Sequence, residues 1–178
     1  MKRTLNCKGK LIDLNEPKVM GILNITPDSF YDKSRFSSND NLLKKTESML
    51  SEGAAFIDVG AYSSRPGAEF VSEEEERKRL IPALETILKE FPDVLLSVDT
   101  FRSNIAKETI DLGASIINDI SGGNMDSEMF DVVVNKQVPY ILMHMRGNPQ
   151  TMSNLNNYDH LIVDIISELQ VKVNHLQK

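Results

Sequence analysis

The segment Val94-Leu95-Leu96-Ser97-Val98-Asp99 is a short, largely apolar run that ends in a carboxylate. Four other runs have the same character, and each ends in a polar side chain suited to chemistry; they span residues 19–24, 56–58, 115–119 and 138–144. Apolar runs of this length are typical of parallel strands that are covered on both faces. Together they predict a parallel sheet whose strand ends bring functional groups to one rim. For a single run, a strand cap or a turn explains the polar residue equally well.

Segments with helical periodicity separate these runs. The first predicted helix covers residues 40–52 and ends at Gly53, a residue suited to a left-handed cap. Ser72 and Glu75 form a capping box for the second helix, in which Pro82 predicts either a kink or a restart.

The remaining helices follow the same rules. The third ends at Gly113, and Asp126 is the expected cap of the fourth. The fourth helix is expected to turn four apolar side chains inward, namely Met129, Phe130, Val133 and Val134. The last helix is expected from about residue 157, with apolar residues four positions apart at Leu161, Ile165, Leu169 and Val173.

This alternation of strand and helix fits either a barrel or an open doubly wound sheet. The open sheet usually carries a glycine-rich turn after its first strand and collects its ligand groups at one switch point. No such turn follows residue 24, and polar groups occur at every strand end, so the pattern favours an α/β fold of the TIM (β/α)8 barrel type. A complete barrel needs about 250 residues. Residues 1–178 are therefore expected to form one domain with only about the first five β/α units.

Composition narrows the class of partner. The net charge is -6 with a pI near 5.1, and 6% of the residues are aromatic, which argues against a nucleic-acid surface because phosphate binding needs a basic footprint. One cysteine, Cys7, excludes an internal disulfide, and the first residues lack the apolar core of a signal peptide. No run approaches the length of a membrane span. We expect a soluble cytoplasmic protein that binds a small molecule.

Two loops carry most of the chemical signal. The first is Asn24-Ile25-Thr26-Pro27-Asp28-Ser29-Phe30, in which the Asn24 amide oxygen suits Mg²⁺ and Asp28 can sit beside a developing positive charge. The second, at residues 60–67, offers two hydroxyls and a guanidinium that can hold an anion. Without further knowledge, each segment can also be an ordinary loop, because glycine and proline are common in turns.

At this point the motifs resemble those of a known family. The first loop is followed in order by Ser63-Ser64-Arg65-Pro66-Gly67, Ser97-Val98-Asp99-Thr100, Ile117-Asn118-Asp119 and Met143-His144-Met145-Arg146-Gly147. This series resembles dihydropteroate synthase over nearly the whole chain. Related pterin-binding methyltransferases share the barrel and parts of the aspartate and asparagine motifs, but the first loop together with the Arg-Pro loop points to the synthase.

The resemblance implies an activity and a set of roles. The family condenses 6-hydroxymethyl-7,8-dihydropterin diphosphate with p-aminobenzoate to give 7,8-dihydropteroate for folate synthesis, and it is a target of sulfonamides. By the resemblance, Asp99 and Asn118 hold the pterin while Ile120 and Met145 provide apolar walls. Asn24 with Mg²⁺ as cofactor would hold the leaving diphosphate.

The family mechanism is dissociative, so it depends on electrostatic stabilisation of charge. The resemblance gives Asp28 the role of stabilising the pterin cation. It assigns the p-aminobenzoate pocket to four residues of the second loop, with Arg65 also in a catalytic role: Ser63, Ser64, Arg65 and Pro66. This chain departs mildly from the family at Ser64, where threonine is usual, and near Ala61 and Tyr62, where glycine or glutamate is frequent.

Simpler structural roles compete with these assignments. Asp99 can be the N-cap of the following helix, and Asn118 can be part of a strand-end turn. His144 lacks the neighbours that a zinc site needs, so a packed histidine at a strand end is the favoured interpretation.

Several elements of the family pattern do not occur in this sequence. They are an aspartate in a Gly-Phe-Gly-Lys-like strand, a lysine in a Ser-Arg-Lys segment, and an Arg-x-His element. The sequence therefore predicts a truncated portion of a synthase with little or no turnover of its own and a homodimer only at full length. A noncatalytic pterin-binding module and a structural half barrel that pairs with another chain are the alternatives.

Overall fold

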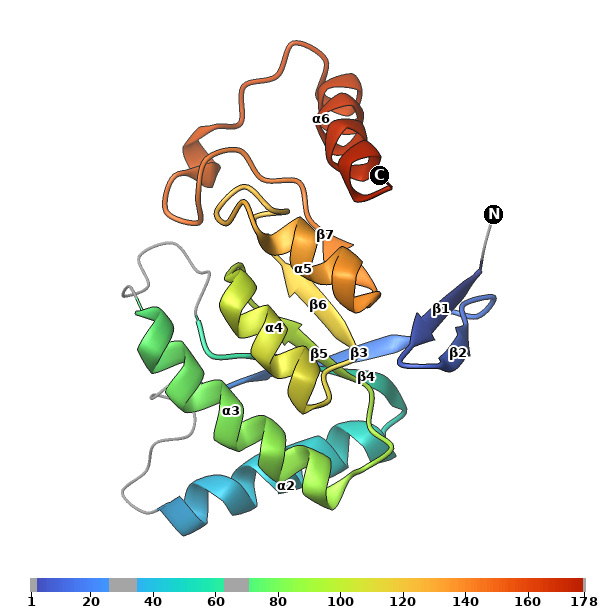
Figure 1. Cartoon of the computed structure of the whole chain (residues 1–178), viewed down its shortest axis with the longest axis vertical. Helices are drawn as coiled ribbons and strands as arrows, with labels where there is room; N and C mark the ends of the chain where they lie inside the picture. The colour runs from blue at the N-terminus through green and yellow to red at the C-terminus, as the bar shows by residue number, and fades with distance from the viewer. Residues whose placement is uncertain (1–2, 26–34, 63–70, 178) are drawn as a thin grey trace.

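The computed structural model describes residues 3–25, 35–62 and 71–177 of the chain (Figure 1). Its strands are β1 Thr4–Cys7, β2 Lys10–Asp13, β3 Val19–Asn24, β4 Ala54–Gly60, β5 Leu96–Asp99, β6 Ile116–Asp119 and β7 Tyr140–Leu142. Its helices are α2 Arg35–Ser51, α3 Glu73–Glu90, α4 Ser103–Leu112, α5 Met129–Lys136, η1 Met152–Asn154 and α6 Leu161–Leu176. All five predicted apolar runs contain a strand.

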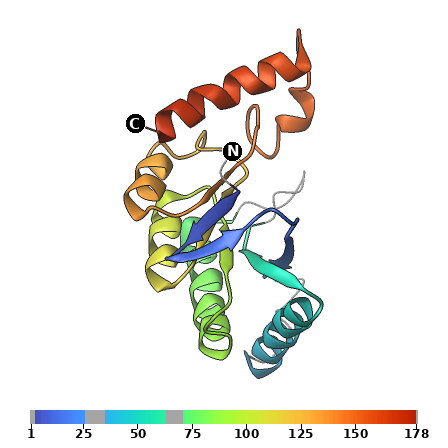
Figure 2. The same ribbon diagram turned by 90° about the vertical axis from the view of Figure 1, so that its right-hand side faces the viewer.

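Strands β3 to β7 form one parallel sheet whose spatial order repeats the order of the chain. Right-handed crossovers in a sheet without a reversal of strand order place every crossover helix on the same face. Each helix from α2 to α6 accordingly contacts the next one (Figures 1 and 2). This arrangement is an arc of a barrel, and it differs from a doubly wound sheet, in which the strand order reverses.

The face of the sheet that meets the helices is apolar. Side chains at alternate positions of the central strands are fully buried there, namely Ile57, Val59, Leu96, Val98 and Ile117. They pack against apolar residues of the helices, including Leu80, Leu84, Ile87, Ile105 and Met129. Because strand side chains alternate between faces, Asp58, Ser97 and Asn118 lie on the opposite, inner face of the arc.

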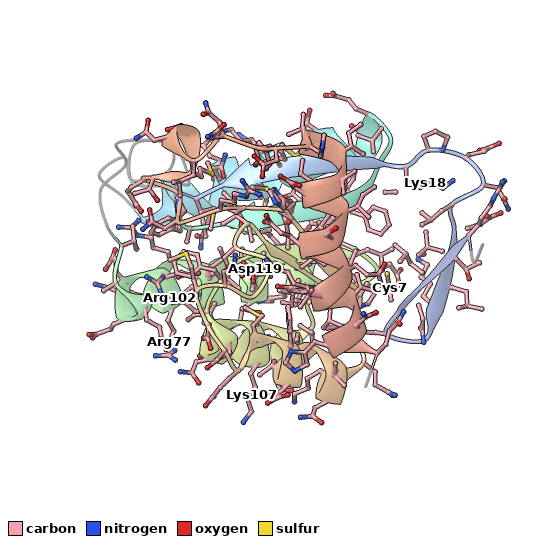
Figure 3. All side chains as sticks on the ribbon, turned by 90° about the horizontal axis from the view of Figure 1, so that it is seen from above. Cys7, Lys18, Arg77, Arg102, Lys107 and Asp119 are labelled. Carbon is pink, nitrogen blue, oxygen red and sulfur yellow. The ribbon has the colours of Figure 1, made fainter. Side chains whose placement is uncertain are left out.

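An antiparallel hairpin, β1–β2, precedes the sheet and was not predicted from the sequence. Its Cys7 is 1% exposed and packs with Phe56 and Ile116 at the amino end of the inner face. Lys8 Nζ also donates a hydrogen bond of 2.9 Å to the backbone oxygen of Ile110 at the end of α4. The hairpin, which carries the Cys7 label in Figure 3, therefore covers the end of the sheet opposite the polar strand ends.

Three predicted helix boundaries are confirmed, whereas α2 begins at Arg35 and not at the expected residue 40. Gly53 has φ 103° after α2, and Gly113 has φ 141° as the C-cap of α4, so both adopt backbone angles that favour glycine. The Ser72 side chain accepts a hydrogen bond from the Glu75 backbone N–H, as the capping box predicted. Helix α3 continues through Pro82, so the alternative of a restart there is wrong.

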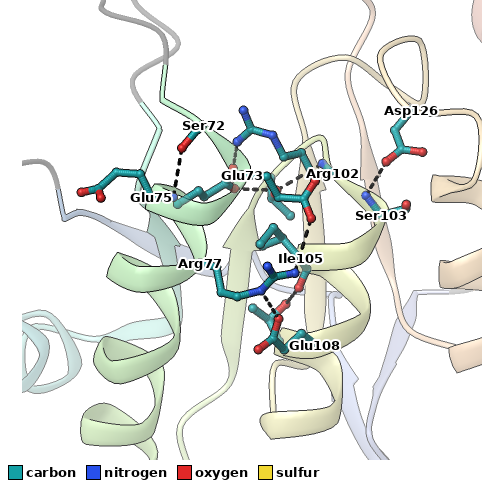
Figure 4. A network of polar contacts seen from close by, with 12 residues as sticks. Ser72, Glu73, Glu75, Arg77, Arg102, Ser103, Ile105, Glu108 and Asp126 are labelled. Carbon is teal, nitrogen blue, oxygen red and sulfur yellow. Dashed lines mark hydrogen bonds and ion pairs between the residues drawn. The ribbon is translucent and has the colours of Figure 1, made fainter.

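Two expectations for α5 are wrong. Its N-cap is Glu128, not Asp126. The Asp126 carboxylate accepts the backbone N–H of Ser103, the first residue of α4, at 2.7 Å (Figure 4), and also that of Glu128 at 3.0 Å just before α5. Val134 is 44% exposed, because this helix of eight residues buries only a narrow stripe at Met129 and Val133.

The last helix also differs from its expected form. Helix α6 begins at Leu161, not near residue 157, since the Asn157 backbone oxygen is bound by Arg146 Nη1 at 2.7 Å in the preceding loop. Leu161 is 55% exposed, whereas Ile165, Leu169 and Val173 are half-buried. No helix in the described part of the chain is long and apolar enough to cross a membrane.

Candidate active site at the carboxyl end of the sheet

Polar side chains from four neighbouring strands gather at the carboxyl end of the sheet. The strand register places Asn24, Gly60, Asp99 and Asn118 in one row across β3, β4, β5 and β6. Asp58 lies two residues before Gly60 on the same inner face of β4. The row forms because parallel strands in register present their last residues at the same edge.

Gly60 leaves room between the two polar groups that flank it. A Cβ atom at this position would lie 3.3 Å from both Cβ and Oδ2 of Asp99, and 3.6 Å from Oδ1 of Asn24. The Asn24 amide and the Asp99 carboxylate therefore approach each other over a residue without a side chain.

The Asp99 carboxyl group has a strongly altered acidity. Burial and the nearby charges of Asp58 and Asp119 raise the pKa of Asp99 from 3.8 to about 7. A buried carboxyl beside like charges favours the protonated form, and a ligand that donates hydrogen bonds favours the charged form. A carboxyl with this pKa at the carboxyl end of a barrel strand is characteristic of functional sites.

Asp58 is a functional candidate that the sequence reasoning placed only at a strand end. The Asn118 amide donates a hydrogen bond from Nδ2 to Asp58 Oδ2 at 3.0 Å. The other carboxylate oxygen, Asp58 Oδ1, and the hydroxyl of Ser97 are buried without a hydrogen-bond partner among the described residues. Unpaired buried polar atoms are costly, so this pair marks a place built for a ligand or for mutual contact. An acidic residue flanked by the apolar Ile57 and Val59 was the available signal.

The competing structural roles of Asp99 and Asn118 do not hold. The N-cap residue of α4 is Arg102, and the first N–H of that helix is bound by Asp126, so Asp99 caps nothing there. Asn118 uses its side chain to reach Asp58 on β4, 60 residues away in sequence, and not to close a local turn.

The two expected apolar walls follow β6 and β7. Ile120 is half-buried two residues after Asn118, and Met145 is 4% exposed. Asn124 donates a hydrogen bond of 3.0 Å from Nδ2 to the Met145 backbone oxygen, which joins the loops after these two strands.

Asp119 organises the loop after β6 from the opposite face of the sheet. Its carboxylate accepts hydrogen bonds from the backbone N–H groups of Ser121 and Gly123 at 2.7 and 2.9 Å, and from the Tyr140 hydroxyl at 2.6 Å. These three bonds fix the strand end that carries Asn118.

A buried ion pair supports the rim after β5. Glu76, on the first turn of α3, is fully buried and binds both the Arg102 guanidinium and the Thr100 hydroxyl, the latter at 2.7 Å. Glu76 is the last of four consecutive glutamates at the start of α3, and its partners lie 24 and 26 residues further along the chain. Figure 4 shows the polar contacts between α3 and α4 in this region, among them Arg77 with Glu108.

His144 has a structural partner, as expected. Its Nε2 atom lies 2.8 Å from Glu168 Oε2 on α6, and the same carboxylate binds Arg146. The pKa of Glu168 is lowered, chiefly by its hydrogen bond with Arg146. This trio holds α6 against the loop after β7.

Asn24 offers an amide oxygen that could bind a metal at the end of β3. Among residues 3–25, 35–62 and 71–177, no group of three or more His, Cys, Asp or Glu side chains could hold a metal ion. Mg²⁺, however, commonly takes one or two protein oxygens and completes its shell with water and substrate phosphates. The Asn24 oxygen beside Asp99 across Gly60 is compatible with that mode. The predicted residues Asp28, Ser63, Ser64, Arg65 and Pro66 lie outside the described residues.

Comparison with known proteins identifies the family. A model of the pterin binding enzymes matches residues 20–178. The chain belongs to the pterin-binding enzyme family. The site described above is thus the carboxyl end of a pterin-binding enzyme sheet.

Individual relatives of this pterin-binding enzyme are dihydropteroate synthases or larger folate-synthesis proteins. The mitochondrial folate synthesis bifunctional protein of Arabidopsis thaliana is 48% identical over an alignment of 178 positions, which covers 97% of this chain and 32% of that protein. The dihydropteroate synthase of Synechocystis is 46% identical over 81% of this chain and 50% of its own length.

Solved structures agree in fold. Yersinia pestis dihydropteroate synthase, in a complex with a sulfonamide drug, superposes with a TM-score of 0.86 at 40% identity, covering 97% of this chain and 62% of that one. Xanthomonas albilineans dihydropteroate synthase with 4-aminobenzoic acid superposes with a TM-score of 0.86 at 32% identity. This match covers 99% of this chain and 62% of that one. The chain therefore spans about a third to two thirds of the length of these relatives, and its five-stranded sheet matches part of their barrel.

Proposed function

We propose that this chain binds the pterin substrate of a dihydropteroate synthase, and that the whole protein condenses 6-hydroxymethyl-7,8-dihydropterin diphosphate with p-aminobenzoate. The main observation in support of the proposal is that Asp58, Asp99 and Asn118 lie together on the inner face at the carboxyl end of the sheet. The names of the relatives support it, because dihydropteroate synthases recur among them.

The arrangement suits the edge of a pterin ring. That edge carries an amino group and ring N–H groups, which donate to carboxylates, while an amide can both donate and accept. Asp99 supplies an acceptor, Asp58 holds the Asn118 amide nitrogen, and Asn118 keeps its amide oxygen for a ligand donor. Because ligand donors stabilise the charged carboxylate, pterin binding is expected to lower the pKa of Asp99 from about 7.

The reacting end of the substrate lies, in this proposal, near Asn24. Asn24 would hold Mg²⁺, which when bound offsets charge on a diphosphate leaving group. Asp28 is proposed to stabilise the pterin cation. The arylamine is assigned to the second loop, with Arg65 acting on the reacting groups: Ser63, Ser64, Arg65 and Pro66.

Binding by direct titration is the decisive test. The intrinsic fluorescence of 6-hydroxymethyl-7,8-dihydropterin diphosphate is followed against the 178-residue chain with and without Mg²⁺, and against Asp99→Asn and Asn118→Ala. We expect saturable binding that both variants weaken. Asp13→Asn, an exposed aspartate of the hairpin, is the matched control and should bind as the parent does. Absence of saturable binding by the parent chain would refute the proposal.

Turnover separates the synthase from a pterin-binding module. We expect the 178-residue polypeptide to form little or no dihydropteroate from p-aminobenzoate in a coupled assay, even where it binds the pterin. Turnover that depends on both p-aminobenzoate and Asn24 would contradict this expectation.

The proposal extends to location and assembly. We place the protein in the cytoplasm, with its two small-molecule substrates as partners and a homodimer as the state of the full-length enzyme. Fractionation of the source cells followed by sedimentation of the native protein tests both statements.

A further inference from the structure

Ser97 is a buried hydroxyl that the proposed function does not use. It is fully buried on β5, and its Oγ atom has no hydrogen-bond partner among the described residues. Its neighbours Leu96 and Val98 face the helices, so Ser97 faces the inner side of the arc, where the ligand groups lie. An inner position of a barrel strand is normally filled by a branched apolar side chain, so a serine here needs a reason.

The strand register supplies a partner for this hydroxyl. Asp58 on β4 is paired directly with Ser97 on β5, and neighbouring strands lie about 4.8 Å apart. Asp58 Oδ1 is the other buried polar atom that lacks a partner among the described residues. A serine hydroxyl is a donor that rotates among three staggered positions, and a carboxylate oxygen is an acceptor. The two unpaired atoms are therefore complementary neighbours.

The second oxygen of the same carboxylate already holds Asn118. Asn118 Nδ2 donates to Asp58 Oδ2 at 3.0 Å, across the strand that carries Ser97. An ionised carboxylate only accepts hydrogen bonds, so this contact fixes which end of the Asn118 amide is the nitrogen. The amide oxygen and the remaining N–H then have defined positions. If the Asp58 carboxylate turned away so that neither oxygen reached Asn118, the amide could flip and exchange its donor and acceptor.

We propose that Ser97 is a positioning residue of the ligand site, whose hydroxyl donates to Asp58 Oδ1 and thereby holds the Asn118 amide in the single orientation that recognises a 2-amino-4-oxo-pteridine edge. This inference rests on the proposed function and deepens it. Ser97 does not touch the ligand; it acts through Asp58 on Asn118. The consequence is selectivity, because a site with fixed donors and acceptors rejects an analogue in which one of them is exchanged.

The experiment compares two ligands on matched variants of the whole chain. The ligands are 6-hydroxymethylpterin and 6-hydroxymethyllumazine, which carries an oxygen in place of the 2-amino group. The parent chain is expected to prefer the pterin, and Ser97→Ala should weaken pterin binding about tenfold while leaving lumazine binding unchanged. Ser97→Thr, which keeps the hydroxyl, should restore the preference.

Ser115→Ala is the matched control. Ser115 is also a buried serine, 3% exposed, but it precedes β6 on the helix-facing side of the sheet. It should change neither affinity. A purely structural role for Ser97 would lower the melting temperature and weaken both ligands equally, which would overturn the proposal.

A second measurement needs no ligand. The side-chain NH₂ signals of Asn118, assigned by their loss in Asn118→Asp, should exchange slowly with solvent in the parent chain and faster in Ser97→Ala. Unchanged exchange together with unchanged pterin affinity in Ser97→Ala overturns the positioning role alone. Failure of the parent chain to bind pterin overturns the proposed function, and the exchange data then decide whether Ser97 positions Asn118.

Discussion

The two ends of the inner face of the sheet contrast in chemistry. At the amino end, Cys7 from the hairpin packs with Phe56 and Ile116, and all three are at most 4% exposed. At the carboxyl end, Asp58 and Asp99 lie close enough for the charge of one to raise the pKa of the other. The same strands β4 to β6 thus run from an apolar end to a polar end within four to seven residues.

This contrast separates stability from recognition. Apolar packing stabilises the fold, whereas buried carboxyls beside unpaired polar atoms cost stability and are retained where they serve a ligand. Barrels in general divide labour in this way between the two ends of their strands. Changes at the amino end should therefore alter unfolding, and changes at the carboxyl end should alter binding.

The largest expected effect is at the amino end. Phe56→Ala should destabilise the protein by about 3–5 kcal/mol, because truncation of a buried aromatic side chain removes its packing and leaves a cavity. Urea unfolding followed by circular dichroism measures this loss. Leu11→Ala, at a residue that is 70% exposed on the hairpin, should cost far less. A comparable loss of unfolding free energy in the two variants would contradict the stabilising role of the apolar amino end.

The next effect is a pH dependence of the unfolding free energy that originates at Asp99. The Asp99 pKa is about 7 in the folded protein and 3.8 as the unperturbed value, so between these values the folded state binds more protons than the unfolded state. Stability contributed by the protonated carboxyl is thus present at low pH and is lost as pH rises through 7, by about 2–4 kcal/mol in total.

Urea unfolding of the parent chain and of Asp99→Asn at pH 4.5, 6 and 8 isolates this contribution. The stability of the variant relative to the parent should rise with pH. If the difference in unfolding free energy between the two proteins is constant across this pH range, Asp99 has the same pKa in the folded and the unfolded state.

A smaller effect is expected for Asp58→Asn. Loss of the charged acceptor at Asp58 should weaken binding of 6-hydroxymethylpterin by about 1.5–3 kcal/mol, the range for hydrogen bonds to charged groups. The variant should unfold in urea at or above the parent midpoint, since it removes a charge that repels Asp99. A large drop in that midpoint would place Asp58 with the stabilising residues and not with the binding site.

The smallest effect on stability is expected in the helix layer, away from both ends of the inner face of the sheet. The Ser72 side-chain oxygen caps α3 by accepting the Glu75 N–H at 3.2 Å. Ser72→Ala removes this cap and should lower the free energy of unfolding by about 1 kcal/mol. Pterin affinity should not change. Thermal unfolding and ligand titration of Ser72→Ala, with Ser72→Asp as the variant that keeps a cap, check both statements.

Local sequence patterns predicted much of this structure. The apolar runs located β3 to β7, and Gly53, Ser72 and Gly113 marked helix ends, because caps and periodicity depend on neighbours within a few residues. Asp99 and Asn118 were also found as candidates, since a polar residue at the end of a buried run is visible in sequence. The resemblance of the motifs to dihydropteroate synthase led to the family that the comparisons show.

Other features required contacts between distant segments. The hairpin β1–β2 was not predicted, because four-residue strands with mixed exposure give no clear period. Asp126 was assigned to the start of α5 alone, although its carboxylate also binds the backbone N–H of Ser103, 23 residues earlier. Glu76 is one of four consecutive glutamates at the start of α3, and only the folded chain brings Arg102 and Thr100 to it in the interior.

The sequence by itself determined the order of strands and helices, the caps that bound several helices, and the polar residues that end the strands, because these depend on short-range steric and hydrogen-bond preferences. Only the tertiary structure decided that Asp58 joins Asn118, that Ser97 faces Asp58, and that Asp99 has a pKa near 7. These properties arise from strand register and burial, which place groups dozens of residues apart in contact and remove the water that would otherwise screen their charges.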